Sequence, residues 1–207
     1  MSVVLTRRAA IVGALTLASR ARADEPSIDE VLAKIAKARA SLKSLVGPFT
    51  QSRKIGLLAS EVKSTGTMTL AGNRLRWELA PPDEIVYWVT PEGLAYKSKN
   101  GQGRVPGNAV RIAAVLGDLR LVLGGDLGGL RARYDLRLVS ATDGAAFEAT
   151  PKKPMPGVQK IAFALAADLV RPTRATLVES ARDKTEIVFG DLQRDVAVDP
   201  AKMRPPA

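Results

Sequence analysis

Two periods of apolar residues follow one another along the chain, one typical of a helix and the other of strands. From Ile28 to Leu45 the apolar residues recur at helical spacing, and Ser27 is a candidate N-cap residue in front of them. This pattern predicts an amphipathic helix of about five turns that ends near Gly47-Pro48. Its apolar stripe would cover one face of a sheet or, alternatively, contact a membrane.

From Phe49 onward apolar and polar residues alternate. In the segment 74–79 the side chains of Leu75, Trp77 and Leu79 fall on one face, and the charged residues fall on the other. Such alternation is typical of antiparallel strands with one apolar and one wet face. Further strands are predicted at residues 64–70, 85–89, 94–96, 134–138, 146–149, 160–165, 174–179 and 185–189. Short, regularly spaced strands predict one curled sheet or barrel without a second domain.

The middle of the chain returns to helical spacing. Residues 101–107 are predicted as a loop, followed by one short helix over Val110–Gly117 and another over residues 119–122. A glycine-rich segment then follows, and it lacks the Lys-Ser or Lys-Thr of a phosphate-binding loop. A helix stop or a hinge between two covering helices is therefore predicted at Gly124, Gly125, Gly128 and Gly129.

The first 23 residues are predicted to be a cleaved signal peptide. Arg7 and Arg8 precede a short uncharged apolar run, and Ala21-Arg22-Ala23 has the small-x-small form of a cleavage site. The apolar run is shorter than the roughly 18 to 20 residues that cross a bilayer. Paired arginines leave both the twin-arginine and the general export route open. We therefore expect a periplasmic mature domain that spans residues 24–207.

Charge and cysteine content narrow the range of partners. The chain has no cysteine, so it has neither a disulfide framework nor a thiol that could carry a lipid anchor. Loss of the four arginines of the signal peptide lowers the formal net charge from +10 to +6. This charge suits a solvated surface, or attraction to anionic lipid headgroups or an acidic partner. Export argues against nucleic acid as a partner.

Histidine is absent as well, so the commonest general base and the soft metal ligands are both missing. We predict no metal and no cofactor. Carboxylate chemistry is formally open to Asp83 with Glu84, or to Asp183 with Glu186. Both pairs fall in polar turns or at strand ends, where carboxylates are ordinarily solvated. We therefore expect a binding protein and not an enzyme.

The apolar face of the predicted sheet could line a concave binding surface or form a filled core. A small barrel can be packed solid or can hold one ligand, and alternation alone does not separate the two. The candidate ligand-binding residues on this face are Met68, Leu70, Leu75, Trp77, Leu79, Tyr87, Phe147, Ile161, Phe163, Leu177, Ile187 and Phe189.

One tract of the chain resembles a known family. Phe49-Thr50-Gln51, the glycine-centred strand at 64–70, Leu75-Arg76-Trp77-Glu78 and Pro81-Pro82-Asp83-Glu84 together are similar to the LolA family of periplasmic lipoprotein carriers. The segment 147–152, Phe-Glu-Ala-Thr-Pro-Lys, is similar to a strand and turn of the same family. This resemblance implies a mainly β fold with helices: an unclosed antiparallel barrel, an N-terminal amphipathic helix, and short lid helices over an apolar concave face.

The resemblance also implies a function. Members of the family take lipoproteins from an ATP-driven complex in the inner membrane and pass them to a receptor in the outer membrane. Here the apolar face would shield acyl chains of lipoprotein or other lipid cargo, the four glycines would form the lid or hinge, and the protein would be a monomer. Ala71-Gly72 stand where well-known carriers have a basic residue and a proline. The alternative is an envelope scaffold or lipid-sensing domain of the same fold without transport.

Overall fold

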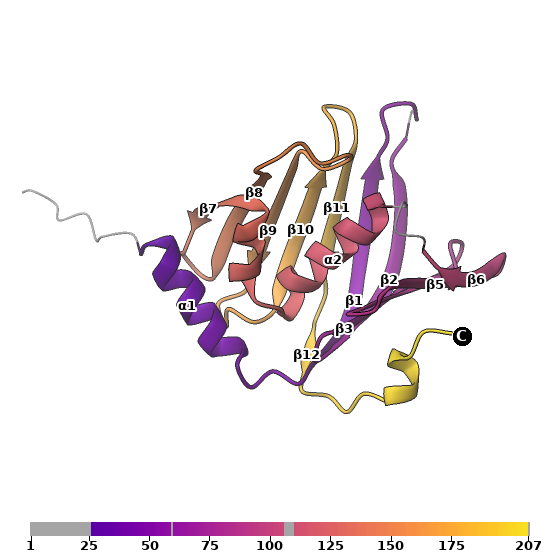
Figure 1. Cartoon of the computed structure of the whole chain (residues 1–207), viewed down its shortest axis with the longest axis horizontal. Helices are drawn as coiled ribbons and strands as arrows, with labels where there is room; N and C mark the ends of the chain where they lie inside the picture. The colour runs from indigo at the N-terminus through magenta and orange to yellow at the C-terminus, as the bar shows by residue number, and fades with distance from the viewer. Residues whose placement is uncertain (1–25, 59, 106–109, 207) are drawn as a thin grey trace, which may run out of the picture.

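One antiparallel sheet forms the body of the protein (Figure 1). The computed structural model describes residues 26–58, 60–105 and 110–206, so the predicted signal peptide lies outside the described residues. The strands are β1 (Ser44–Lys54), β2 (Val62–Ala71), β3 (Arg74–Leu79), β4 (Ile85–Thr90), β5 (Gly93–Ser98), β6 (Gly101–Arg104), β7 (Tyr134–Ser140), β8 (Ala145–Pro151), β9 (Lys160–Leu165), β10 (Pro172–Val178), β11 (Lys184–Phe189) and β12 (Gln193–Arg194).

The strand order shows that the sheet is not closed. The strands run β6-β5-β4-β3-β2-β1-β11-β10-β9-β8-β7, and β12 pairs with the first part of β1. The N-terminal and C-terminal strands meet where β1 pairs with β11, with Phe49 opposite Phe189. Within the described residues β6 and β7 lie at the two ends of this order and do not pair with each other. The predicted unclosed antiparallel barrel is therefore confirmed, and each predicted strand is present.

Helix α1 (Ile28–Arg39) begins where the sequence predicts. A capping box forms at its start, because the Ser27 hydroxyl accepts a hydrogen bond from the backbone N–H of Glu30 at 3.3 Å. In return the Glu30 carboxylate accepts one from the backbone N–H of Ser27 at 2.9 Å. Asp29 and Glu30 lie in the first turn, where the helix dipole favours negative charge.

The predicted end of this helix is wrong. The helix ends at Arg39 and not near Gly47-Pro48, because β1 already begins at Ser44. Leu45, which fits the helical stripe, is instead fully buried in β1 opposite Leu70 of β2. A short apolar run fits either period, and here the pairing with β2 determines its conformation.

Two further predictions are corrected, and the C-terminal tail is also ordered. Helix α2 (Val110–Gly124) is one continuous helix and not two pieces, and the 3₁₀ helix η1 (Leu127–Ala132) follows it. The predicted loop at 101–107 begins as strand β6. The C-terminal tail forms the 3₁₀ helix η2 (Pro200–Met203), and the indole N–H of Trp88 donates to the carbonyl of Lys202 at 2.9 Å. Strand β6 is ordered by pairing with the adjacent β5, and the C-terminal helix by its contact with Trp88, which is distant in the sequence.

Helices α1 and α2 lie on the same face of the sheet (Figure 1). Val31 and Ile35 of α1 and Val122 and Leu123 of α2 are buried there in one core with the inward residues of the strands. In the part of the chain that the structure describes, no helix is both long and apolar enough to span a membrane. The two helices thus cover the apolar concave face, as predicted.

Candidate functional site

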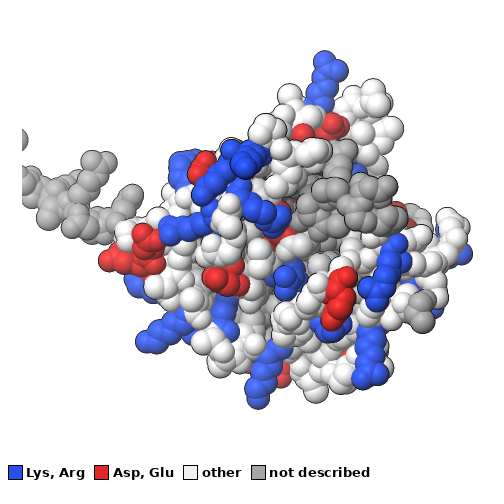
Figure 2. Space-filling model, viewed as in Figure 1, with Lys and Arg blue, Asp and Glu red and all other residues white. Residues whose placement is uncertain are grey.

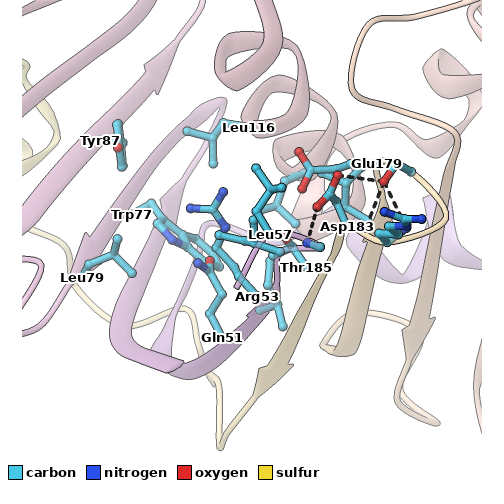
Figure 3. A pocket seen from close by; sticks show the side chains of 17 residues that line it. Gln51, Arg53, Leu57, Trp77, Leu79, Tyr87, Leu116, Glu179, Asp183 and Thr185 are labelled. Atoms are coloured by element: carbon cyan, nitrogen blue, oxygen red, sulfur yellow. Dashed lines mark hydrogen bonds between the residues drawn. The ribbon is translucent and has the colours of Figure 1, made fainter. Parts of the chain in front are cut away.

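A cavity of about 600 Å³ lies on the concave face, between strands from both halves of the sheet and helix α2 (Figure 3). Its wall alternates as the strands predict: Gln51, Arg53 and Ile55 face inward from β1 and the residue after it, whereas Ser52 and Lys54 do not line it. The lining residues are Gln51, Arg53, Ile55, Gly56, Leu57, Trp77, Leu79, Tyr87, Leu116, Leu119, Leu177, Glu179, Ser180, Arg182, Asp183, Thr185 and Ile187. The inner wall is apolar, and most of the polar side chains come from β1, β11 and the β10–β11 loop.

The structure divides the twelve predicted ligand-binding residues into two groups. Five line the cavity: Trp77, Leu79, Tyr87, Leu177 and Ile187. The remaining seven belong to the packed interior and are not among the lining residues of this cavity: Met68, Leu70, Leu75, Phe147, Ile161, Phe163 and Phe189. The same face of the sheet is therefore solid in one part and hollow in another.

Trp77 is one of the two aromatic residues of the wall, with Tyr87, and two further rings pack against it. Its ring stacks on Phe49 at a centroid distance of 3.7 Å and meets Phe189 edge-on at 6.2 Å. Gly66 makes room for this arrangement, because a Cβ atom there would lie 2.5 Å from the ring of Phe49 and would also collide with the carbonyl oxygen of Glu78. Aromatic pairs of this kind contribute about 0.5–1.5 kcal/mol beyond their buried area. The glycine-centred strand thus positions the tryptophan.

Helix α2 forms the roof of the cavity, with Leu116 and Leu119 on its inner side. Asp118, between them in the sequence, is fully buried and accepts hydrogen bonds from the Tyr134 hydroxyl and the Arg133 guanidinium. A buried carboxylate is stable only when it is paired in this way. This polar contact ties the roof to the start of β7.

Arg39 ties the end of the roof to α1. Arg39 is only 7% exposed, and its guanidinium donates to the carbonyls of Val122 at 2.9 Å, Gly125 at 3.3 Å and Val170 at 3.3 Å. Burial lowers the pKa of Arg39 to about 10, and the nearby carboxylate of Asp168 opposes part of this shift. Carbonyls at the C-terminal end of α2 and that of Val170 therefore replace part of the hydration that the guanidinium loses.

A third contact of the roof involves the turn at Ala71-Gly72, where well-known carriers of the family have a basic residue and a proline. Arg120 of α2 donates to the carbonyl of Asn73 at 3.1 Å. Asn73 directly follows Ala71-Gly72, so a cation does reach this turn, but it comes from the roof helix. Sequence reasoning missed Arg39, Asp118 and Arg120. Two signals were present, since Arg39 falls on the apolar stripe of α1 and Asp118 interrupts an apolar helix.

The four predicted hinge glycines lie at the junction of α2 and η1. A Cβ atom at Gly124 would collide with the Leu70 side chain, so this glycine lets α2 approach β2 closely. At Gly125 a Cβ would lie 2.9 Å from the backbone of Leu121, and at Gly129 it would meet nothing within 4 Å. Space restricts the residue type at the end of α2, whereas Gly129 is in open surroundings.

Two of the carboxylates considered from the sequence accept hydrogen bonds from neighbouring segments. The Asp83 carboxylate accepts from the Ser64 hydroxyl at 2.6 Å, and the Asp183 carboxylate accepts from the backbone N–H of Gly56 at 2.8 Å. Glu186 is not among the lining residues, and hydrogen bonding to Lys184 lowers its pKa. These groups hold turns and strand surfaces in place.

Comparisons with known proteins concern the fold. No family model matches the sequence, and no curated protein matches it significantly. An uncharacterized conserved protein from Thermus thermophilus aligns over 87% of this chain and 95% of its own, with a TM-score of 0.54 and 12% identity. A DUF1329 family protein from Desulfovibrio piger aligns over 87% and 98%, with a TM-score of 0.49 and 12% identity. A LolA superfamily protein from Nitrosomonas europaea aligns over 86% and 98%, with a TM-score of 0.46 and 11% identity.

At these identities the likeness extends to the architecture alone. The open sheet, with β1 and β11 at its centre, carries two helices on its concave face and a cavity beneath the second of them. The fold of this chain, an unclosed antiparallel sheet with helices on its concave face, is similar to that of the Thermus thermophilus protein.

Proposed function

We propose that the protein is a periplasmic carrier that shields acyl chains of a lipoprotein or another lipid in the cavity beneath α2. The observation that supports this function is a cavity of about 600 Å³ with an apolar inner wall, under a helix on the concave face of the sheet. Its size lies in the range of sites for small lipophilic ligands, about 300–1,000 Å³. Burial is worth about 0.8 kcal/mol per methylene, so ten methylenes would gain roughly 8 kcal/mol on entering it.

The construction of the roof is compatible with uptake and release. Helix α2 contributes Leu116 and Leu119 to the cavity, but much of its attachment is polar, through Arg39, Asp118 and Arg120. These hydrogen bonds hold α2 in the closed position, and water can replace them when the helix moves. We propose that α2 moves as the lid, with the glycines from Gly124 to Gly129 as its hinge.

The partners follow from this role. Cargo would arrive from an ATP-driven complex in the inner membrane and leave to a receptor in the outer membrane, with the carrier acting as a monomer. The role requires no metal, cofactor, nucleic acid or enzymatic step. At the mouth of the cavity, the Asp183 carboxylate is already bonded to Gly56 and to the Ser180 hydroxyl, at 2.8 and 2.7 Å. It therefore supports the loop and is poorly placed as a catalytic base.

A lipid-sensing domain of the same fold is the second candidate. It is favoured by the depth at which Arg39 and Asp118 are buried, because both would resist repeated opening of the roof. Rapid, reversible exchange of a lipid probe would favour the carrier, whereas tight retention of one lipid would favour the sensor.

The test compares two neighbours on one strand. Ile187 lines the cavity, and Val188 faces the other side of β11 and is exposed. We expect Ile187→Glu to weaken the binding of a fluorescent fatty acid at least tenfold, about 1.4 kcal/mol, and Val188→Glu to leave it unchanged. Mass spectrometry of protein purified from the envelope should identify an acylated species. Absence of both probe uptake and a co-purifying lipid would overturn the proposal, as would equal effects of the two substitutions in folded protein.

A further inference from the structure

The tip of the β1–β2 hairpin carries two adjacent leucines in solvent. Leu57 is 95% exposed and Leu58 is 51% exposed. Single exposed apolar residues are ordinary, but two side by side at the end of a projecting hairpin mark a candidate interaction site. The hairpin extends beyond the helices that cover the sheet (Figure 1). The other exposed large apolar residues of the described chain are Val62, at the start of β2, and the separate Val139, Val188 and Val196.

The tip is held in place by its neighbours. The backbone N–H of Gly56 donates to the Asp183 carboxylate at 2.8 Å, which ties the tip to the β10–β11 loop. Across the hairpin, the Ser52 hydroxyl donates to the Glu61 carboxylate at 2.7 Å. Because the tip is already ordered, less conformational entropy is lost when it binds a partner. The two leucines are therefore held in a position suited to binding.

Cations surround the base of this tip. Arg53 and Lys54 at the end of β1 and Lys63 at the start of β2 are all exposed, and Glu61 is the one acidic residue of the hairpin between residues 53 and 63. Among the side chains that the structure describes, none of these three cations forms an ion pair. Figure 2 shows uncharged atoms, a projecting basic side chain and acidic atoms at the end of the molecule where Figure 1 places this hairpin and the β10–β11 loop. Apolar residues at a tip with unpaired cations behind them suit an anionic lipid surface.

The same tip forms part of the rim of the cavity. Ile55, Gly56 and Leu57 line the cavity, and Leu58 follows them on the outside. We infer that Leu57 and Leu58 insert into the interfacial layer of an anionic bilayer, with Arg53, Lys54 and Lys63 at the headgroups, so that the mouth of the cavity docks on the membrane. This surface binds the bilayer directly, without a protein receptor, and goes beyond acyl-chain carriage.

The geometry favours a bilayer over a protein groove as the occupant. The cations lie on both faces of the hairpin, because Arg53 faces the cavity, whereas Lys54 and Lys63, which is paired with Ser52, face away from it. A planar surface of headgroups can meet all of them at once, and each contributes about fivefold to affinity for an anionic membrane. Two leucines add apolar insertion at a depth that leaves the cations in the headgroup layer.

The experiment is co-sedimentation of the mature protein with vesicles of phosphatidylcholine alone or with about one third phosphatidylglycerol. We expect binding to the mixed vesicles, at least a tenfold loss in Leu57→Asp/Leu58→Asp, and no change in Val139→Asp, which alters an equally exposed apolar residue on β7. Lys54→Gln/Lys63→Gln should lose most binding to mixed vesicles. Leu58→Asp alone spares the cavity lining and should reduce vesicle binding while it retains fatty-acid uptake.

Failure of the wild-type protein to bind either kind of vesicle would overturn the inference. Vesicle binding by the leucine variants that equals that of the wild-type protein would overturn it as well. Loss of transfer to an outer-membrane protein by the leucine variants, with vesicle binding unchanged, would assign the tip to a protein partner instead. Fatty-acid uptake is measured without vesicles. A failure of fatty-acid uptake would therefore contradict the proposed carrier function, and it would not affect the result of the vesicle-binding test.

Discussion

The β8–β9 part of the concave face is filled, and the part around β1, β3 and β11 is hollow, although both are built from strands with the same alternation. In the filled part Phe147 lies opposite Phe163, and the two rings stack at 5.1 Å. In the hollow part the opposed inward residues are Gln51 with Ile187 and Arg53 with Thr185. The rings of Phe147 and Phe163 fill the space in their part of the face, whereas the shorter or polar side chains where β1 meets β11 leave it open. Trp77 and Tyr87 also lie opposite each other but line the cavity, so the place of a pair in the curled sheet, and not residue size alone, decides whether it belongs to the core or to the cavity.

The sharpest test of this comparison truncates one residue in each part. Phe163→Ala should lower the free energy of unfolding by about 3–5 kcal/mol, because it opens a void in a packed core. Leu177→Ala, at the cavity wall, should cost only about 1 kcal/mol because one side of the residue already faces open space. Chemical denaturation measures both values.

Binding of a fatty-acid probe should reverse that order. Leu177→Ala should weaken binding several-fold, and Phe163→Ala should leave the affinity of the folded fraction nearly unchanged. Equal losses of stability, or a larger loss of affinity in Phe163→Ala, would mean that the two parts do not differ as described.

A second prediction concerns the roof that makes the hollow part possible. Arg39→Met removes the guanidinium that satisfies carbonyls of Val122 and Val170, so we expect a loss of about 2–3 kcal/mol in unfolding free energy. Lys37→Met, an exposed change of the same type on the same helix, is the control and should cost less than about 0.5 kcal/mol. Stopped-flow uptake of the probe should be faster in Arg39→Met because α2 opens more readily. If Arg39→Met and Lys37→Met have the same stability and the same uptake rate, Arg39 does not hold the roof helix in place.

The smallest expected effect lies in the roof helix itself. A Cβ atom at Gly117 would meet nothing within 4 Å, so Gly117→Ala should raise the free energy of unfolding by about 0.5–1 kcal/mol through helix propensity. A stiffer roof should also slow uptake of the probe. Gly124→Ala is the matched contrast and should destabilise the protein, because its Cβ would collide with Leu70. Destabilisation by Gly117→Ala would show that α2 is not a regular helix at that point.

The sequence predicted the strands well because each carries its own alternation. Leu75, Trp77 and Leu79 face inward, as the period of two requires, and the strand boundaries agree closely with the structure. Predictions failed where a short run fits two periods, as at Leu45, or where a distant partner orders a segment, as Trp88 does for the C-terminal helix. The roof contacts were missed because Arg39, Asp118 and Arg120 find partners that no local pattern identifies.

By itself the sequence determined the fold class, the two-faced strands, the absence of histidine and thiol chemistry, and the covering helices. These properties are local, since they depend on residue type and on periods of two and about four residues. Only the tertiary structure decided which inward residues meet across strands, and so separated Phe147 and Phe163 in the core from Leu177 and Ile187 at the cavity. It also decided that Leu57 and Leu58 stand at the rim of that cavity. Distances between strands depend on how the whole sheet curls, and no short stretch of sequence specifies that curl.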